Sequence, residues 1–453
     1  MECGYGKVCI NPPLGIAIGG SYDIRPGKGF LDDLYARSVA FSDGERSSVI
    51  VSVDLCHMET AQCDYCRDEI SKAAGIDRDA IIIVCTHTHA GPDVYLTERI
   101  ENGYPEIARA MREYIEFLCE SIVKSALLAV EDLKPSKLYS ASARAEGIAN
   151  VRRYKMKDGT TVTNPGAHNP NVDRPIGKPN ETVKLLKVVR EDANDIYVVN
   201  FAMHGTTVKG RTYYSADYPG VVCSTIEAAL GGVDCIFLQG ACGDVVQINA
   251  FPTPEIKSLI SEDFKTLSQN KLMARYTGHR IVAAVLEAHM TAKEIAADKI
   301  GFEKTSVEIP ANKQGGDLIE AQRICELYKQ ERQHELPHKN DMDLVTIVAN
   351  ALRVVRMQNE PGFYSYDVFC VTVGDFAFAC LPGEQFTETR NKIEDRSPFE
   401  NMMVIELANC KSAYFPTTEA YSEGGYEVAT TNIGPDSDNR VISATVKMLE
   451  HLK

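Results

Sequence analysis

Residues 81–92 read IIIVCTHTHAGP, an apolar run that leads directly into Thr-His-Thr-His and then a Gly-Pro turn. The β-branched run predicts a buried strand. Because alternate side chains of a strand share a face, we expect His87 and His89 to emerge together where the strand meets its turn. Two imidazoles at such a strand end supply one metal ligand and one proton-transfer group, whereas a pair of hydrogen-bonded core histidines is the alternative.

Strands and helices alternate along the chain on both sides of this segment. A helix-period stretch separates the first two strands, which is typical of a βαβ unit. The pattern therefore predicts an α/β fold, with a mixed sheet flanked by helices and a metal site at the strand carboxyl ends. The expected strands are 48–55, 81–89, 182–189, 196–204 and 234–239, and the expected helices between them include 59–74, 105–133 and 218–230.

Two further features lie in the second half of the chain. Residues 312–359 are charged and helix-prone, and we interpret them as a helical insertion. Residues 364–373 and 376–381 predict a hairpin around Gly374-Asp375, a dipeptide that tolerates the positive backbone angles of a tight turn. We expect residues 1–453 to form a single catalytic domain that carries this insertion.

Charge and hydropathy exclude several classes of partner. The 453 residues include 48 basic and 63 acidic side chains, for a formal net charge of −15. Nonspecific attraction to nucleic acid or to an anionic membrane is therefore not expected. No segment approaches the roughly 18 apolar residues of a transmembrane segment, and no signal peptide is seen, which predicts a cytoplasmic location. The sequence does not indicate an oligomeric state.

Four apolar strands run into polar or metal-competent residues beside a small residue or proline. In open α/β sheets ligands bind at the carboxyl ends of strands, so these four segments are expected to converge on one crevice. The segments are Thr86–Pro92, Asn200–Gly205, Leu381–Glu384 and Asn409–Tyr414.

The order and spacing of these segments resemble the neutral (non-lysosomal) ceramidases, in their amino-terminal zinc-dependent catalytic domain. The resemblance covers nearly the whole chain, and it also includes Ser215–Gly220, Gly243–Val245, Thr417-Thr418 and Gly425–Glu427. It implies an enzyme that hydrolyses the amide (N-acyl) bond of a small-molecule or lipid-like substrate such as a sphingolipid, by zinc-activated water.

The resemblance also implies which residues form the site. The Zn²⁺ ligands would be His87, His204, Glu384 and Tyr414. Phenolate is an uncommon zinc donor, so a packed loop tyrosine is the alternative for Tyr414.

Two catalytic residues are implied beside the metal. His89 would exchange protons with the reacting water or the leaving amine. An arginine would stabilise the tetrahedral oxyanion, and Arg152 fits that position better than Arg153. A surface salt bridge is the alternative for this arginine. Asp54 and Asp217 are candidates to support the site, or else solvated turn carboxylates.

The chain departs from the family pattern at Val246, where the family has a serine after Gly-Asp-Val. Valine neither donates a hydrogen bond nor acts as a nucleophile, so a serine-dependent mechanism is excluded at this position while a zinc-water mechanism survives. The family's carboxyl-terminal β-sandwich domain is not expected here. Two alternatives stay open: a metal-dependent esterase or other carbonyl hydrolase acting on a soluble substrate, and a catalytically silent metal-binding homologue.

Overall fold

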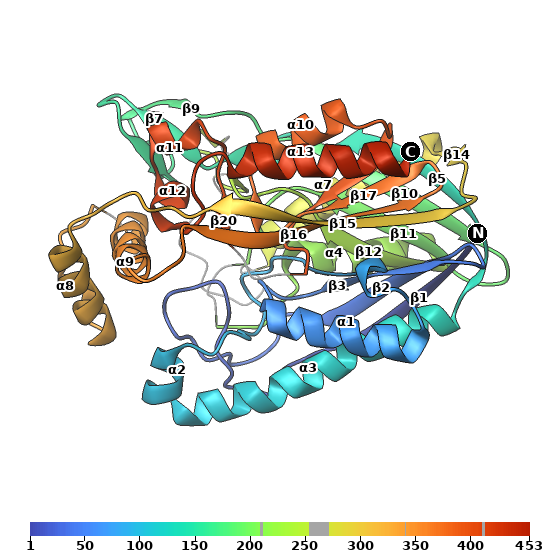
Figure 1. The fold of residues 1–453 in the computed structure, drawn as a ribbon, viewed down its shortest axis with the longest axis horizontal. Helices are drawn as coiled ribbons and strands as arrows, with labels where there is room; N and C mark the ends of the chain where they lie inside the picture. The colour runs from blue at the N-terminus through green and yellow to red at the C-terminus, as the bar shows by residue number, and fades with distance from the viewer. Residues whose placement is uncertain (209–211, 253–270, 340, 410–412) are drawn as a thin grey trace.

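Two β-sheets lie at the centre of the molecule in the computed structural model, which describes residues 1–208, 212–252, 271–339, 341–409 and 413–453 (Figure 1). The larger sheet has the strand order β12-β11-β10-β5-β1-β2-β3-β4, with β14 also paired to β5, and the smaller has the order β15-β16-β17-β19. The strands of the larger sheet are β1 (Glu2–Cys9), β2 (Tyr35–Ser42), β3 (Ser47–Val53), β4 (Ile81–Cys85), β5 (Lys134–Arg144), β10 (Thr182–Arg190), β11 (Asp195–Phe201), β12 (Val233–Gln239) and β14 (Lys293–Ile295). Those of the smaller sheet are β15 (Ile300–Pro310), β16 (Phe363–Val373), β17 (Phe376–Cys380) and β19 (Asn401–Ile405).

The larger and the smaller sheet each contain both parallel and antiparallel strand pairs. The pairs β3–β4, β11–β12 and β17–β19 are parallel, and the other neighbours in these sheets run antiparallel. All five side chains of β4 are buried, as expected for a parallel strand covered on both faces. The predicted α/β class with a mixed sheet flanked by helices is confirmed.

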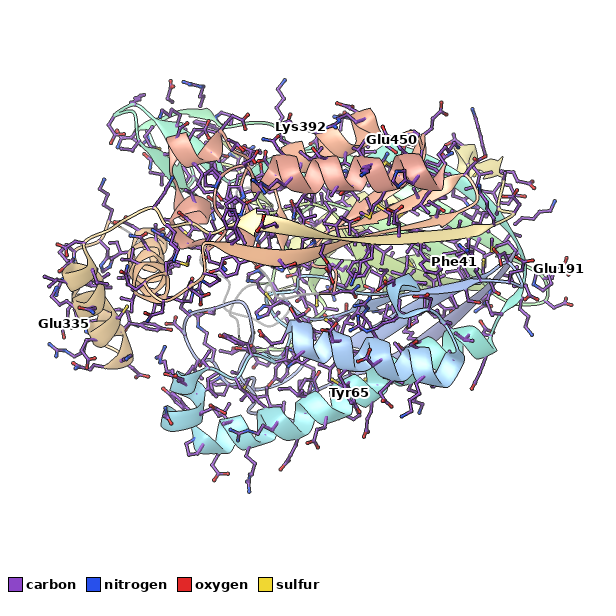
Figure 2. The ribbon with its side chains drawn as sticks, viewed as in Figure 1. Phe41, Tyr65, Glu191, Glu335, Lys392 and Glu450 are labelled. Atoms are coloured by element: carbon purple, nitrogen blue, oxygen red, sulfur yellow. The ribbon has the colours of Figure 1, made fainter. Side chains whose placement is uncertain are left out.

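The two sheets pack face to face, which the sequence pattern did not predict. One continuous apolar core contains residues of β1 to β4 and of β16, β17 and β19. Within it the rings of Phe41 on β2 and Phe378 on β17 lie 6.0 Å apart between centroids. Figure 2 shows Phe41 in the interior of the molecule.

Helices cover the outer face of each sheet, so the layers run helix, sheet, sheet, helix (Figure 1). Each helix buries an apolar stripe against the strands beneath it. The larger sheet is covered by α1 (Thr60–Ala74), α3 (Pro105–Glu131), α4 (Asp217–Leu230) and α7 (Leu272–Thr291), and the smaller sheet by α10 (Thr387–Arg396) and α13 (Ser437–Leu452).

A helical excursion separates the paired strands β15 and β16. It contains α8 (Leu318–Lys329), the 3₁₀ helix η2 (Gln333–Glu335) and α9 (Asp341–Arg356). These helices fall within the predicted insertion 312–359, of which residue 340 lies outside the described residues. The predicted hairpin is confirmed, because β16 and β17 pair antiparallel around Gly374, whose φ is 56°.

Short elements complete the described part of the chain. Among its helices none is long and apolar enough to cross a membrane. The short strands are β6 (Asn150–Val151), β7 (Arg153–Met156), β8 (Thr161–Thr163), β9 (Val172–Pro175), β13 (Val245–Val246), β18 (Glu384–Gln385) and β20 (Tyr414–Phe415). The short helices are η1 (Arg78–Ala80), α2 (Glu98–Gly103), α11 (Ala420–Glu423) and α12 (Tyr426–Thr430).

Candidate metal centre

His87 follows β4 directly and is buried. The predicted strand 81–89 is too long: β4 ends at Cys85, and His87 has a left-handed backbone with φ of 61°. The chain turns here because Thr88 leaves the sheet, donates a hydrogen bond to the carbonyl of Ser215 and bridges to Gly205. Strand alternation is therefore not what brings His87 and His89 together, although their rings do meet, with centroids 4.7 Å apart.

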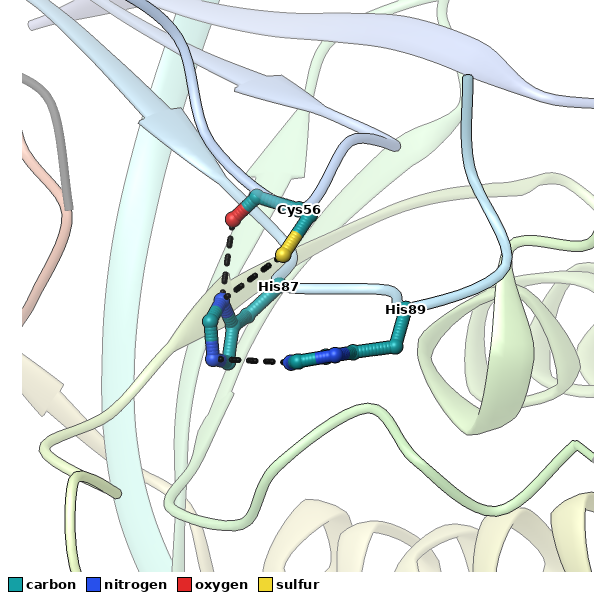
Figure 3. A group of neighbouring side chains, drawn as sticks. All are labelled: Cys56, His87 and His89. Carbon is teal, nitrogen blue, oxygen red and sulfur yellow. Dashed lines mark hydrogen bonds between the residues drawn. The ribbon is translucent and has the colours of Figure 1, made fainter. Parts of the chain in front are cut away.

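The tautomer of His87 follows from its partner. Its Nδ1 lies 2.9 Å from the carbonyl oxygen of Cys56 (Figure 3). A carbonyl only accepts, so Nδ1 carries a proton and, in the neutral ring, Nε2 presents a lone pair.

His204 follows β11 and is arranged in the same way. Its Nδ1 lies 2.7 Å from the carbonyl oxygen of Cys242 and 3.1 Å from that of Val245. Nδ1 is therefore the donor, and Nε2 of the neutral ring is left as an acceptor. Both histidines thus have the second partner that orients a metal-binding imidazole.

Glu384 completes this group from the smaller sheet. It begins β18, just after β17, and Gly383 before it has a φ of 62°. Its Oε2 lies 3.3 Å from Nε2 of His87 and 3.1 Å from Nε2 of His204. The ligand atoms of the three buried residues all lie within 4.8 Å of one another. Two imidazole nitrogens and one carboxylate oxygen are an ordinary donor set for zinc, so the residues fit the metal.

The pKa shifts show that this cluster attracts positive charge. Burial lowers the pKa of His87, but the Glu384 carboxylate and Cys56 outweigh it and raise that pKa well above 6.5. Burial raises the pKa of Glu384, yet His87 and His204 together bring it well below 4.5. Burial, with Arg152 and His87, lowers the pKa of His204 to about 4. The buried carboxylate and the two imidazoles therefore favour a positive charge among them, which a bound cation would supply.

His89 lies beside His87, with the two Nε2 atoms 3.3 Å apart. Its Nδ1 lies 3.0 Å from the carbonyl oxygen of Gly20, so Nδ1 is the donor and Nε2 faces the cluster. Cys56 approaches from the other side, and its Sγ lies 3.8 Å from Nδ1 of His87 (Figure 3). Cys56, His87 and His89 form a second possible ligand group that shares His87 with the first.

Arg152 reaches the cluster, and the surface salt bridge considered for it is wrong because only 5% of the residue is exposed. Its Nε donates to Glu427 at 2.7 Å, and another guanidinium nitrogen donates to the carbonyl of Gly243 at 2.7 Å. The remaining nitrogen lies 3.2 Å from Nε2 of His204. Arg153 pairs with Glu423 at 3.0 Å, and its Nε lies 3.7 Å from Glu427. Of the two arginines, it is Arg152 that the structure brings within 3.2 Å of His204.

Tyr414 lies on β20, which pairs with β18 so that Tyr414 is opposite Glu384. Its ring is stacked on that of His204 with centroids 6.5 Å apart, and the Arg152 guanidinium lies 5.1 Å above it. Burial raises the pKa of Tyr414 well above 10. Tyr414 is therefore beside the predicted ligands, and its role as a ligand stays a prediction. Residues 410–412 of the predicted segment Asn409–Tyr414 lie outside the described residues.

Three supporting residues were not assigned a role from the sequence. Gly20 holds His89 through its carbonyl, and Glu427 holds Arg152. Buried Glu406 accepts hydrogen bonds from the backbone nitrogens of Cys242 and Gln385, which joins the segments carrying a His204 partner and Glu384. Only Glu427 had a sequence signal, since it belongs to the quoted Gly425–Glu427.

Asp54 and Asp217 are buried, so neither is a solvated turn carboxylate. Asp54 pairs with Arg37 at 2.9 Å and accepts a hydrogen bond from Thr86, next to His87. Asp217 accepts from the backbone nitrogens of Thr207 and Val208. Both carboxylates stabilise the backbone near the cluster.

The helix–sheet–sheet–helix layers and the buried His-His-Glu group at strand ends define a protein with a candidate metal site. Residues 15–256 match the family model described as neutral/alkaline non-lysosomal ceramidase, N-terminal. The chain belongs to this family, and the resemblance drawn from the sequence is confirmed. The family and fold support a ceramidase-like hydrolase.

Solved structures show the same fold. The neutral ceramidase from Pseudomonas aeruginosa matches with a TM-score of 0.72 at 16% identity, over 99% of this chain and 74% of that one. A ceramidase complexed with C2 matches with a TM-score of 0.70, also at 16% identity and over 99% and 74% of the two chains. A search of curated proteins found no match.

Proposed function

We propose that this protein is a zinc-dependent hydrolase that cleaves a linear amide bond of an N-acyl compound in a ceramidase-like way. The observation that carries the proposal is the convergence of Nε2 of His87, Nε2 of His204 and Oε2 of Glu384, within 4.8 Å of one another. The orientation of both Nδ1 atoms toward carbonyls supports it, because each ring then presents Nε2 to the cluster.

The metal would be held by His87, His204, Glu384 and Tyr414. Zinc bound there would lower the pKa of a coordinated water toward about 7 and polarise the substrate carbonyl. His89 presents Nε2 to the cluster while the Gly20 carbonyl keeps the proton on Nδ1, so Nε2 is the atom that would accept a proton and later donate it to the leaving amine.

Arg152 supplies positive charge where an oxyanion develops. Glu427 and the carbonyl of Gly243 fix two edges of the guanidinium, which leaves the nitrogen near His204 directed into the cluster. A preorganised donor of this kind stabilises a tetrahedral oxyanion without reorganising during the reaction.

The substrate class follows from the family, whose members act on ceramide. An N-acyl lipid, or a smaller and more soluble N-acyl compound, is the proposed substrate. We also propose that residues 1–453 work as one catalytic domain, and the cytoplasmic location stays a prediction.

Matched substrates and metal exchange test the function. The purified protein is assayed on N-acyl amides and on esters with the same acyl chain, before chelation, after chelation and after addition of Zn²⁺. We expect amide turnover that chelation abolishes and zinc restores. Turnover of esters alone would favour the esterase alternative. Zinc binding without turnover of either series would favour the silent homologue that Val246 suggests.

A further inference from the structure

The helical excursion contacts the loop that contains Gly19, Gly20 and Tyr22, which we call the Tyr22 loop. This loop reaches His89. Tyr328 of α8 donates its hydroxyl hydrogen to the carbonyl of Tyr22 at 2.7 Å. Arg99 of α2 donates to the same carbonyl at 3.0 Å, and its guanidinium lies 4.7 Å from the centre of the Tyr328 ring. Two donors from different helices therefore hold one backbone oxygen of the loop.

Glu331, just after α8, ties these helices together. It accepts from Arg99 at 3.0 Å and from the hydroxyl of Tyr104 at 2.6 Å. Arg99 thus bonds the loop and the excursion simultaneously, with its planar fork shared between Tyr22 and Glu331.

Gly20, which contacts His89, lies only two residues before Tyr22 in this loop. Gly20 accepts from Nδ1 of His89, and Gly19 donates its backbone N–H to the carbonyl of Gly91. The position of the Gly20 carbonyl therefore depends on a short segment held at Gly19 on one side and at Tyr22 on the other.

The excursion also contacts α12, the helix that contains the Arg152 partner Glu427. Arg353 of α9 is buried and donates to the carbonyls of Ala429 at 2.8 Å and Gln314 at 3.0 Å. Asn312 donates its side-chain amide to the carbonyls of Val428 and Thr431. These bonds fix α12, which contains Glu427, the partner of Arg152.

We propose that the α8–α9 excursion is a positioning element that holds the two groups flanking the metal cluster, His89 through the Tyr22 loop and Arg152 through α12. Figure 1 shows α8 and α9 at one end of the molecule, with α2 and α12 nearby. The proposal rests on the proposed function for its kinetic consequence, while the geometry of His89 is measurable without any substrate. Tyr328, Arg99 and Arg353 are positioning residues in this scheme.

The test uses the double variant Tyr328→Phe/Arg99→Met, which removes both side-chain donors to the Tyr22 carbonyl. Its control is Glu335→Gln, which breaks a 2.7 Å ion pair with Arg332 in the same excursion. Figure 2 shows Glu335 at the outer edge of the molecule. Arg353→Lys tests the second arm, with Arg353→Gln as its charge-removing counterpart.

Two readouts separate positioning from stability. In the zinc-loaded full chain, we expect the double variant to lower kcat by about tenfold while KM changes less than about twofold, as for a group acting on the chemical step. Nitrogen-15 NMR of the histidines should show His89 as the Nδ1–H tautomer in the parent and control, and as a tautomer mixture in the double variant. Arg353→Lys should retain more of kcat than Arg353→Gln.

Either of two outcomes would overturn the inference: an unchanged His89 tautomer in the double variant, or kinetics equal to those of Glu335→Gln. If the parent protein hydrolyses no N-acyl amide, the proposed function fails, and the tautomer measurement still decides whether the excursion positions His89.

Discussion

At the scale of single residues, the site depends on groups that fix the direction of each functional side chain. His87, His89 and His204 all point Nδ1 at a backbone carbonyl, so the three Nε2 atoms face a common volume. Residue types predicted one metal ligand and one proton-transfer group from His87 and His89. The family resemblance implied His87 and His204 as ligands and His89 as the proton-transfer group. The carbonyl partners were not predictable, because a backbone oxygen carries no sequence signal.

Gly20 lies so close to His89 that there is no room for a side chain. Its φ is 73°, and an added Cβ would lie 2.3 Å from Nδ1 of His89 and 2.9 Å from Sγ of Cys56. Gly20→Ala should therefore displace the His89 ring and lower kcat by about a hundredfold, the typical loss of a general acid–base group. Steady-state kinetics and metal content measure this, and the metal content should be retained.

Gly15→Ala is the control for that change. Gly15 also has a positive φ, 96°, but an added Cβ meets nothing within 4 Å. An equal loss of kcat in the two variants would show that backbone strain, and not the collision with His89, causes the loss.

Glu427 holds Arg152 through a buried ion pair. Replacing it with glutamine removes the negative charge that holds Nε of buried Arg152. We expect Glu427→Gln to lower kcat by about tenfold with little change in KM, because a displaced oxyanion donor affects the transition state.

Glu423→Gln is the matched variant, since Glu423 pairs with the neighbouring Arg153 instead. It should keep parental kinetics. A similar loss in both variants would assign the effect to the α11–α12 region in general and not to Arg152.

At the scale of elements, close packing of α3 on β1 depends on glycine. A Cβ added at Gly4 would lie 2.0 Å from the carbonyl oxygen of Ala129 on α3. Gly4→Ala should force the helix away from the strand and lower the free energy of unfolding by about 1–3 kcal/mol. Denaturant unfolding measures the change. Gly315→Ala, where a Cβ meets nothing within 4 Å, should be near neutral, and an equally stable Gly4→Ala would refute the packing account.

The start of α4 has a pH-dependent contribution to stability. Burial raises the pKa of Asp217 from 3.8 to about 6. Because the folded pKa is above the unfolded one, this stabilising contribution is fully present below pH 3.8 and is lost as the pH rises through about 6. Relative to Asp217→Asn, the parent should lose up to about 3 kcal/mol across this interval. If the free energy of unfolding of the parent and of Asp217→Asn changed equally with pH, Asp217 would not be the group responsible.

Local elements were predictable and their assembly was not. The β16–β17 hairpin follows from the Gly374-Asp375 turn, and β4 follows from its isoleucine run, because both signals lie within a few residues. The face-to-face stacking of two sheets rests on contacts such as Phe41 with Phe378, which no local pattern encodes. The left-handed turn at His87 was also missed, because a tertiary contact of Thr88 creates it.

At the scale of the whole molecule, the site joins the two sheets. His87 and His204 follow strands of the larger sheet, and Glu384 follows a strand of the smaller one. The sheets must therefore stack before the three ligand atoms meet. The sequence predicted this meeting from the shared pattern of strand ends, while the distances between the atoms required the three-dimensional structure.

Anomalous X-ray diffraction at the zinc absorption edge shows whether a metal ion binds between the two sheets. We expect one strong peak per chain, about 2.0–2.2 Å from Nε2 of His87, Nε2 of His204 and a carboxylate oxygen of Glu384. Crystals of zinc-treated protein with no peak among these atoms, or with the only peak elsewhere, would contradict the proposed metal site.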